Sequence, residues 1–298
     1  MKIVLTGATG FIGRHLCACL ASTPHALTVL CRDDAHPALA WLAARGVRPK
    51  IVKFDIAADV DADAIAAGAA NAASLYKRIG EPDMLIHLAW AGVNNTQSPE
   101  HMTGELPRHL AFLTRLIEGG LPRLVVAGSC SEYGLQAGAL KETLPCNPST
   151  PYGLAKYCLL RQLEYLRATR PFELLWTRPF FMYGEGQNPN SIYPQLLRAL
   201  AGNASEFPMS GGEQLRDYLP VEEVARMMAA LALSRRTGVV NVCSGQPVSV
   251  RRMVERWLAE RHATIRLDLG HYPYREYEPM AFWGDTERLR DYLNHPNP

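Results

Sequence analysis

The sequence predicts an α/β fold: a doubly wound parallel sheet with a smaller C-terminal substrate-binding lobe. Three observations support this prediction. Short apolar runs alternate with helical segments over the first 178 of 298 residues, a glycine-rich turn follows the first run, and the composition changes after Arg178. Alternation of strand and helix is typical of a parallel sheet covered by helices on both faces.

Six runs of six or seven residues, rich in Val, Ile and Leu, are expected to be strands. They span 2–7, 26–32, 50–56, 84–90, 123–129 and 173–179. Continuous apolar runs of this length are typical of strands buried on both faces, as in a parallel sheet. Helical spacing marks the segments 13–21, 106–118 and 152–167 between them. The Ala-rich stretch 57–74 is expected to be a surface helix with loops.

The second part of the chain is expected to interleave with the first. A loop rich in Gly, Asn and Pro after residue 183 precedes a helix near 195–203, and further helices are expected at 221–234 and 251–261. A strand near 239–244 is expected to join the sheet. We therefore predict a dinucleotide-binding domain of residues 1–178 plus 221–246, and a substrate-binding lobe of residues 179–220 plus 247–298.

Composition argues against several classes of protein. The formal net charge of +2 is too small to favour a nucleic-acid or membrane surface, and no run of eighteen apolar residues is present. The seven cysteines form no C-x-x-C pair, so neither a metal site nor a disulfide framework is indicated. His87, inside an apolar run, is expected to be a hydrogen-bonded core residue. We expect a cytoplasmic protein.

Gly7, Gly10 and Gly13 form a G-x-x-G-x-x-G turn between the first strand and the first helix. Glycines permit a tight turn and close approach of the backbone, and a helix N-terminus attracts a pyrophosphate. The turn therefore predicts dinucleotide binding on a Rossmann-type sheet. Its neighbours Thr9, Phe11 and Ile12 are expected to contribute to the same site.

The end of the second strand bears on the choice of cofactor. A carboxylate there would bind the ribose of NAD, whereas a basic residue would accommodate the 2′-phosphate of NADP. The strand ends in Cys31 and Arg32, and Asp33 follows one step later. We therefore expect NADP, with NAD as the alternative. Asp55, followed by Ile56, ends the third strand and is expected either to bind the adenine or to cap a turn.

Tyr152 and Lys156 form Y-x-x-x-K on a predicted helix, so both side chains face the same way. A cation beside a phenol lowers the phenol's pKa, which prepares the tyrosine to exchange a proton with a carbinol or carbonyl oxygen. Ser129 ends another strand, at the edge where open α/β sheets place ligands, and its hydroxyl can bind the same oxygen.

The motifs TGATGFIG, KFDI, HLAW, GSCSEYG, YGLAK, RPFFMYGEGQ and LRDYLPVEEVA, in this order, resemble the extended short-chain dehydrogenase/reductases of the epimerase/dehydratase type. The resemblance covers almost the whole chain. It implies a catalytic set of Ser129, Tyr152 and Lys156. It also implies that Leu88, Ala89 and Pro179 line the cofactor site and that Arg216 binds a substrate phosphate; the further substrate contacts that we expect are Arg275, Gln187 and Asn188.

The sequence departs from the family pattern at two places. Phe181 stands where Asn is usual in R-P-F-N-V-Y-G, and His109 begins a segment that is usually N-V-x-G-T. The pattern is most similar to reductases of 4-keto-6-deoxyhexoses linked to a nucleotide such as dTDP. We therefore expect NADPH-dependent reduction of such a sugar in deoxysugar biosynthesis, by a homodimer.

Other functions remain open. A nucleotide-sugar C4 epimerase with tightly bound NAD is the first alternative. A dehydratase is disfavoured because Cys130-Ser131 replaces the usual Asp-Glu pair. A reductase of a carbonyl compound without a nucleotide would have no need of Arg216. A non-catalytic NADP-binding regulatory protein would have no need of the Tyr152 phenol.

Overall fold

The computed structural model describes residues 1–65 and 70–296, and it confirms the doubly wound α/β fold. The central sheet has the order β11-β7-β5-β4-β1-β2-β3, and every pair in it is parallel. Its strands are β1 (Lys2–Thr6), β2 (Ala26–Cys31), β3 (Lys50–Lys53), β4 (Met84–His87), β5 (Arg123–Ala127), β7 (Glu173–Pro179) and β11 (Gly238–Val242). The predicted runs therefore all contribute strands to one sheet.

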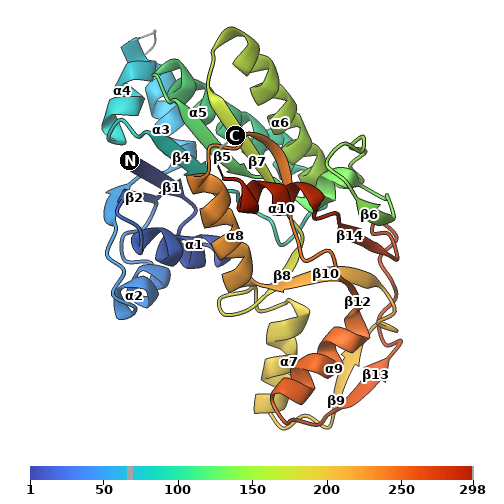
Figure 1. Cartoon of the computed structure of the whole chain (residues 1–298). Helices are drawn as coiled ribbons and strands as arrows, with labels where there is room; N and C mark the ends of the chain where they lie inside the picture. Colours follow the sequence, from blue (N-terminus) through green and yellow to red (C-terminus); the bar gives the residue numbers. More distant parts are fainter. Residues whose placement is uncertain (66–69, 297–298) are drawn as a thin grey trace.

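Helices cover both faces of this sheet (Figure 1). One face packs against α1 (Phe11–Ala21), α2 (Pro37–Ala44) and α8 (Val221–Leu233). The other packs against α4 (Ala70–Arg78), α5 (Leu106–Glu118) and α6 (Pro151–Thr169). In β1, Ile3 and Leu5 belong to the first core and Val4 to the second. This alternation explains why the run is apolar at every position.

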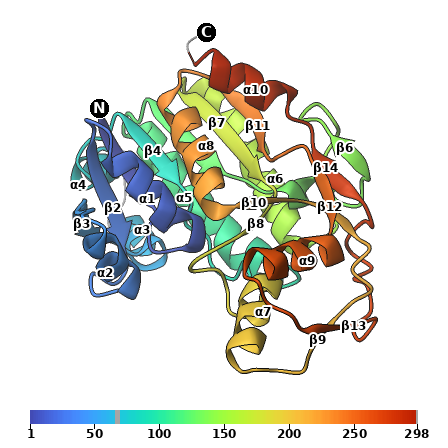
Figure 2. The same cartoon turned by 60° about the horizontal axis from the view of Figure 1, so that its bottom comes forward.

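The smaller lobe has its own core around the buried Trp257. It contains α7 (Ile192–Ala201), α9 (Val250–Glu260) and the paired strands β9 (Glu206–Met209) and β13 (Arg266–Leu269). A three-stranded sheet of β8 (Phe181–Tyr183), β10 (Leu215–Pro220) and β12 (Pro247–Ser249) lies between this lobe and the main sheet (Figure 2).

The end of the chain returns to the larger domain. β14 (Phe282–Gly284) pairs with β6 (Gly138–Leu140), and α10 (Glu287–Asn294) packs on β11 and α8. The domain boundary that we expected at residue 247 stays a prediction. The structure adds that α10, which falls in the predicted smaller lobe, lies against the main sheet. In the Ala-rich stretch, α3 (Ile56–Ile65) and α4 are helical as expected, and residues 66–69 lie outside the described residues. No described helix is long and apolar enough to cross a membrane.

Candidate functional site

The predicted cofactor turn joins β1 to α1. Its backbone is packed so closely at Gly7 and Gly13 that neither position has room for a side chain. Gly7 has φ +74°, and a Cβ atom there would lie 2.7 Å from the amide nitrogen of Ala89. A Cβ at Gly13 would lie 1.9 Å from the carbonyl oxygen of Gly7. Gly10, which caps α1 without a side chain, donates its N–H to the Gly7 oxygen at 2.9 Å. These residues fit a dinucleotide pyrophosphate, which needs a bare backbone at a helix N-terminus.

The remaining predicted cofactor residues lie around this turn and the adjoining strand ends. Thr9, Phe11 and Ile12 are partly exposed within or just after the turn, Leu88 and Ala89 follow β4, and Pro179 ends β7. The carboxyl ends of parallel strands share one edge of a sheet, so these residues surround a single crevice. The backbone N–H of Ala89 donates to the Thr6 hydroxyl at 3.3 Å, which ties the loop after β4 to β1.

Two strand ends bear on the adenosine side of the predicted cofactor. Arg32 is exposed directly after β2, while the Asp33 carboxylate accepts the Ala35 N–H at 2.9 Å within a local turn. Asp55 precedes Ile56, the first residue of α3, and its carboxylate accepts the Ala57 N–H at 3.0 Å. The structure therefore gives Asp55 a capping contact, and its binding of adenine stays a prediction.

The predicted catalytic residues come from two elements. Ser129 follows β5 and caps the short helical segment η2 (Cys130–Tyr133), where its hydroxyl accepts the Ser131 N–H at 3.1 Å. Tyr152 and Lys156 lie on successive turns of α6, which Thr150 caps by accepting the Gly153 N–H. The Lys156 ammonium is 2% exposed and donates to the Ala127 carbonyl oxygen at 3.0 Å, at the end of the same strand that carries Ser129.

In the protein alone, burial outweighs the effect that we expected Lys156 to have on the pKa of the Tyr152 phenol. Burial raises the pKa of Tyr152, and a hydrogen bond with the Ser129 hydroxyl acts in the opposite direction. Burial also lowers the pKa of Lys156 to about 7, against the attraction of Glu132 and Glu105. The Lys156 nitrogen lies 6.0 Å from the Tyr152 ring centroid and bonds to Ala127 instead, so desolvation of both groups prevails.

A buried ion pair that the sequence analysis missed holds Ser129 in place. The Glu132 carboxylate is 0% exposed; it accepts the Ser129 N–H at 2.8 Å and the Trp176 indole N–H at 2.9 Å. Its second oxygen pairs with the Arg178 guanidinium at 2.7 Å. A buried carboxylate needs such partners, and here they fix the backbone beside the predicted catalytic hydroxyl. Glu132 and Arg178 stand in the recognised motifs, but nothing in their spacing indicates that they meet.

One cavity of about 780 Å³ brings most of the predicted site together. It lies among the carboxyl edge of the main sheet, the three-stranded sheet and the smaller lobe. The predicted residues that line it are Ser129, Tyr152, Ile12, Pro179, Gln187, Asn188, Arg216 and Arg275. The volume suits a ligand larger than a simple sugar. All the predicted substrate-binding residues therefore face the same cavity.

The two predicted phosphate-binding arginines share one carboxylate. Arg216 is 3% exposed and pairs with one oxygen of Glu278 at 3.0 Å, while Arg275 pairs with the other oxygen at 3.1 Å. The Arg216 guanidinium also lies 5.5 Å from the Phe181 ring centroid. Two arginines against one carboxylate leave one positive charge in the cavity wall, which favours an anionic ligand there.

Two amide oxygens of the cavity wall are buried without a hydrogen-bond partner among the described residues. They belong to Gln187 and Gln214. The Gln187 side-chain nitrogen donates to the Met182 carbonyl oxygen at 3.0 Å, which fixes its amide so that the oxygen is the free acceptor. The Asn188 side chain instead accepts the Asn190 N–H at 2.8 Å. Gln187 thus offers an acceptor to a ligand hydroxyl or N–H group.

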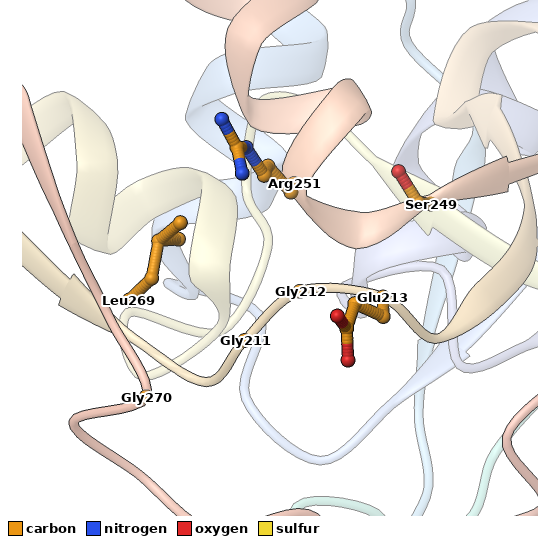
Figure 3. Close-up of a pocket in the computed structure, with 7 residues that line it drawn as sticks. All are labelled: Gly211, Gly212, Glu213, Ser249, Arg251, Leu269 and Gly270. Atoms are coloured by element: carbon orange, nitrogen blue, oxygen red, sulfur yellow. The ribbon is translucent and has the colours of Figure 1, made fainter.

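A separate hollow of about 470 Å³ lies in the smaller lobe (Figure 3). Gly211, Gly212, Glu213, Ser249 and Arg251 line it together with the turn at Leu269 and Gly270. It shares no lining residue with the large cavity. The amides at the start of α9 are already bonded: those of residues 250 and 251 to carbonyl oxygens, and that of Arg252 to the Ser249 hydroxyl. We assign it no role in binding.

Comparison with known proteins identifies the family to which the sequence is related. The model of the NAD dependent epimerase/dehydratase family matches residues 3–243. The chain is 30% identical over 285 residues to a dTDP-6-deoxy-L-talose 4-dehydrogenase (NAD(+)) from Aggregatibacter actinomycetemcomitans, covering 95% of this chain and 99% of that protein. It is 26% identical to a GDP-6-deoxy-D-mannose reductase from Pseudomonas aeruginosa, covering 97% and 90%.

Solved structures show the same fold. A UDP-glucose 4-epimerase from Stenotrophomonas maltophila, with bound NAD and formylated UDP-arabinopyranose, superimposes with a TM-score of 0.82. Its sequence identity is 22%, and the match covers 99% of this chain and 92% of that one. A UDP-N-acetylglucosamine 4-epimerase from Methanobrevibacter ruminantium has a TM-score of 0.81 at 23% identity, covering 97% and 90%. At this identity the likeness concerns the fold alone.

Proposed function

Because the chain belongs to the NAD dependent epimerase/dehydratase family, whose members among its relatives act on nucleotide sugars, we propose that it transfers hydride at C4 of a nucleoside-diphosphate 6-deoxyhexose. In the physiological direction it would reduce the 4-keto sugar. A dTDP-6-deoxyhexose is the substrate we favour. The A. actinomycetemcomitans relative is named for oxidation at the same carbon of a dTDP-6-deoxy sugar, and oxidation and reduction at C4 are one reaction in two directions.

The single observation that carries this proposal is the composition of the large cavity. The hydroxyls that would bind the sugar oxygen, from Ser129 and Tyr152, share the cavity with Arg216 and Arg275, which would bind a diphosphate. A reductase of simple carbonyl compounds would have no use for the arginines, and a binding protein would have no use for the phenol.

The residues divide the chemistry among them. Bound NADP(H) would supply or accept the hydride. Tyr152 would give its proton to the C4 oxygen during reduction, and the raised pKa of its phenol keeps that proton in place for transfer. Ser129, held through its N–H by Glu132, would orient the carbonyl oxygen. Lys156, on the next turn of α6, would bind the nicotinamide ribose. Gln187 would accept a hydrogen bond from a sugar hydroxyl or from the base.

We propose NADPH as the preferred cofactor and NADH as the alternative. The support for NADPH is the exposed Arg32 after β2 and the engagement of the Asp33 carboxylate in its own turn. The support for NAD is that the 30% identical relative is named for NAD(+). Competitive binding of the two cofactors distinguishes them.

A C4 epimerase is the second candidate, favoured by the shared fold with two epimerases. An epimerase regenerates its cofactor in every cycle, whereas a reductase consumes one NADPH for each product. The experiment is to measure nucleotide that copurifies with the protein, and then to follow reduced-nicotinamide absorbance with a dTDP-4-keto-6-deoxyhexose. Stoichiometric loss of NADPH is the expected result. Interconversion of two sugar nucleotides without added cofactor or absorbance change would identify an epimerase.

We also propose a homodimer formed along α6. Leu154 and Tyr165 are 40% and 73% exposed, and their separation of eleven residues, about three turns, places both on one face of this helix. These two exposed apolar side chains on one helix face are the support for an interface there. Sedimentation equilibrium should give twice the chain mass, and Tyr165→Glu should weaken the association.

A further inference from the structure

Four buried side chains beside the proposed catalytic pair form a continuous hydrogen-bonded chain. The Thr6 hydroxyl lies 2.9 Å from His87 Nδ1, and His87 Nε2 lies 2.9 Å from His109 Nδ1. His109 Nε2 lies 3.2 Å from Oε2 of Glu105. Of these residues, Thr6, His87, His109 and Glu105 are 1%, 0%, 4% and 8% exposed. The chain thus runs from β1 through β4 to α5, and ends on the carboxylate of Glu105.

The direction of every hydrogen bond in this chain follows from the carboxylate. An ionised carboxylate only accepts, so His109 Nε2 carries a proton. Burial lowers the pKa of both His109 and His87, which keeps both rings neutral. His109 Nδ1 is then an acceptor, His87 Nε2 donates to it, and the Thr6 hydroxyl donates to His87 Nδ1. Each buried polar atom of the chain has a hydrogen-bond partner in this arrangement.

Glu105 is held in its ionised form. Its carboxylate accepts the Ala91 N–H at 2.7 Å as well as the His109 proton, and Arg108 lies 3.2 Å from its other oxygen. The hydrogen bond from His109 and these further contacts lower the pKa of Glu105 to about 2, although burial opposes them. A negative charge is therefore fixed beside the loop that follows β4.

Trp90, on that loop, connects the chain to Lys156. Its ring stacks on the His109 ring at a centroid distance of 4.7 Å and an interplanar angle of 12°. The Lys156 ammonium lies 4.0 Å from the centroid of the Trp90 ring. The indole N–H of Trp90 donates to His101, whose ring lies 5.2 Å from that of Tyr152. The Trp90 ring thus forms a surface that both Lys156 and Tyr152 contact, so its position affects both side chains.

We propose that Glu105 is a positioning residue for Lys156: through His109 it fixes Trp90 beside the ammonium, and its buried negative charge keeps Lys156 protonated. The inference deepens the proposed function and rests on it for the role of Lys156. Lys156 is the only buried lysine of the six, so its charge needs a counterion. Two carboxylates favour the ammonium, and each has an arginine partner. Glu132, the stronger of the two, pairs with the buried Arg178, whereas the partner of Glu105 is Arg108, whose side chain is 39% exposed.

The groups that face Lys156 come from several elements. Glu132 lies on η2, Tyr152 on α6 and His87 on β4, while Glu105 directly precedes α5 and His109 lies in its first turn. Among these, the two histidines are neutral and Tyr152 keeps its proton, so the two glutamates supply the negative charge, and their partners Arg178 and Arg108 supply positive charge behind them. Replacing Glu105 by Gln retains an acceptor for Ala91 and for His109 but removes the charge. The deprotonation midpoint of Lys156 should therefore move to lower pH by about one unit.

The test uses protein labelled with ¹³C and ¹⁵N in lysine, and follows the Cε and Nζ signals of Lys156 with pH. The signal is assigned as the one absent from Lys156→Met. Glu100→Gln is the matched control, because Glu100 also pairs with Arg108, at 3.1 Å, but is exposed and makes no hydrogen bond to His109 in the described part of the chain. We expect the midpoint to fall in Glu105→Gln and to stay within 0.3 unit, roughly the error of a titration, in Glu100→Gln.

An unchanged midpoint in folded Glu105→Gln overturns the proposal, and so does an equal shift in the Glu100→Gln control. If Glu105→Gln does not fold, Glu105→Asp and Glu105→Asn provide a pair that differs only in charge. These titrations need no substrate, so their outcome is independent of the proposed activity. With an active enzyme, the alkaline limb of the kcat/KM profile should move with the midpoint, by about tenfold in rate at the steepest pH.

Discussion

Because Lys156 is buried, we predict that the stability of the folded protein depends on pH. The side chain is 2% exposed, and burial lowers the pKa of its ammonium from 10.5 to about 7. Between these values the unfolded chain binds one more proton than the folded protein, so the stability of the wild type should rise with pH. The slope from this group is about 1.4 kcal/mol per pH unit. Below pH 7, burial of the ammonium lowers the free energy of unfolding by at most roughly 5 kcal/mol.

Lys156→Met removes this charge while keeping an unbranched side chain of similar length. The lost hydrogen bond leaves the Ala127 carbonyl oxygen unpaired, which costs about 1–3 kcal/mol. The variant should therefore be more stable than the wild type at pH 6–7, by roughly 2–4 kcal/mol from these two figures. At pH 9 the difference should be smaller by roughly 3 kcal/mol.

Urea unfolding, followed by tryptophan fluorescence at pH 6, 7, 8 and 9, measures these differences. Lys50→Met, which changes an exposed lysine of β3, is the matched control and should parallel the wild type. A difference between Lys156→Met and the wild type that stays constant within about 0.5 kcal/mol from pH 7 to 9 would refute the reasoning. It would mean that the folded protein keeps Lys156 hydrated or fully paired.

Three further predictions concern the proposed site. Tyr152→Phe should lower turnover by about 10² or more while cofactor affinity stays unchanged, and turnover near that of the wild type would remove the phenol from the mechanism. Gly13→Ala places a methyl group 1.9 Å from the Gly7 carbonyl oxygen, so cofactor affinity measured by calorimetry should fall, and an unchanged affinity contradicts the assigned turn. Arg32→Ala should weaken NADPH binding about tenfold or more and leave NADH binding nearly unchanged; equal affinities of the native protein for both cofactors would count against NADPH.

The fold was predictable because its signals are local. Each apolar run of the first 178 residues contributes a strand to one parallel sheet, and α5 covers the predicted segment 106–118 without a difference at either end. The glycine turn was predictable for the same reason, since three glycines and their flanking elements all lie within residues 2–21. Local periodicity contains the information that such elements require.

The electrostatics of the site were not predictable in this way. One turn of helix correctly places Tyr152 and Lys156 on one face of α6, but it does not reveal that Lys156 is fully buried and that Tyr152 is half-buried in the cavity wall. Desolvation then reverses the expected direction of the phenol's pKa shift. Glu132 and Arg178 are 46 residues apart and meet only because η2 and β7 adjoin in the fold. Such pairings depend on tertiary contacts that no spacing along the chain encodes.

The two departures from the family pattern acquire a physical meaning from the same tertiary contacts. Phe181, in the place of a hydrogen-bonding Asn, packs its ring near the Arg216 guanidinium and 5.6 Å from the Phe282 ring. The two rings cover the Arg216 guanidinium, whose side chain is 4% exposed, while its partner Glu278 remains 27% exposed. His109, in the place of the other Asn, joins Glu105 to Trp90. In the first place a ring lies beside the buried Arg216 guanidinium; in the second an imidazole stacks on Trp90, whose ring lies beside the Lys156 ammonium. The substitutions therefore change how the charges of the site are held, and they leave its hydroxyl groups in place.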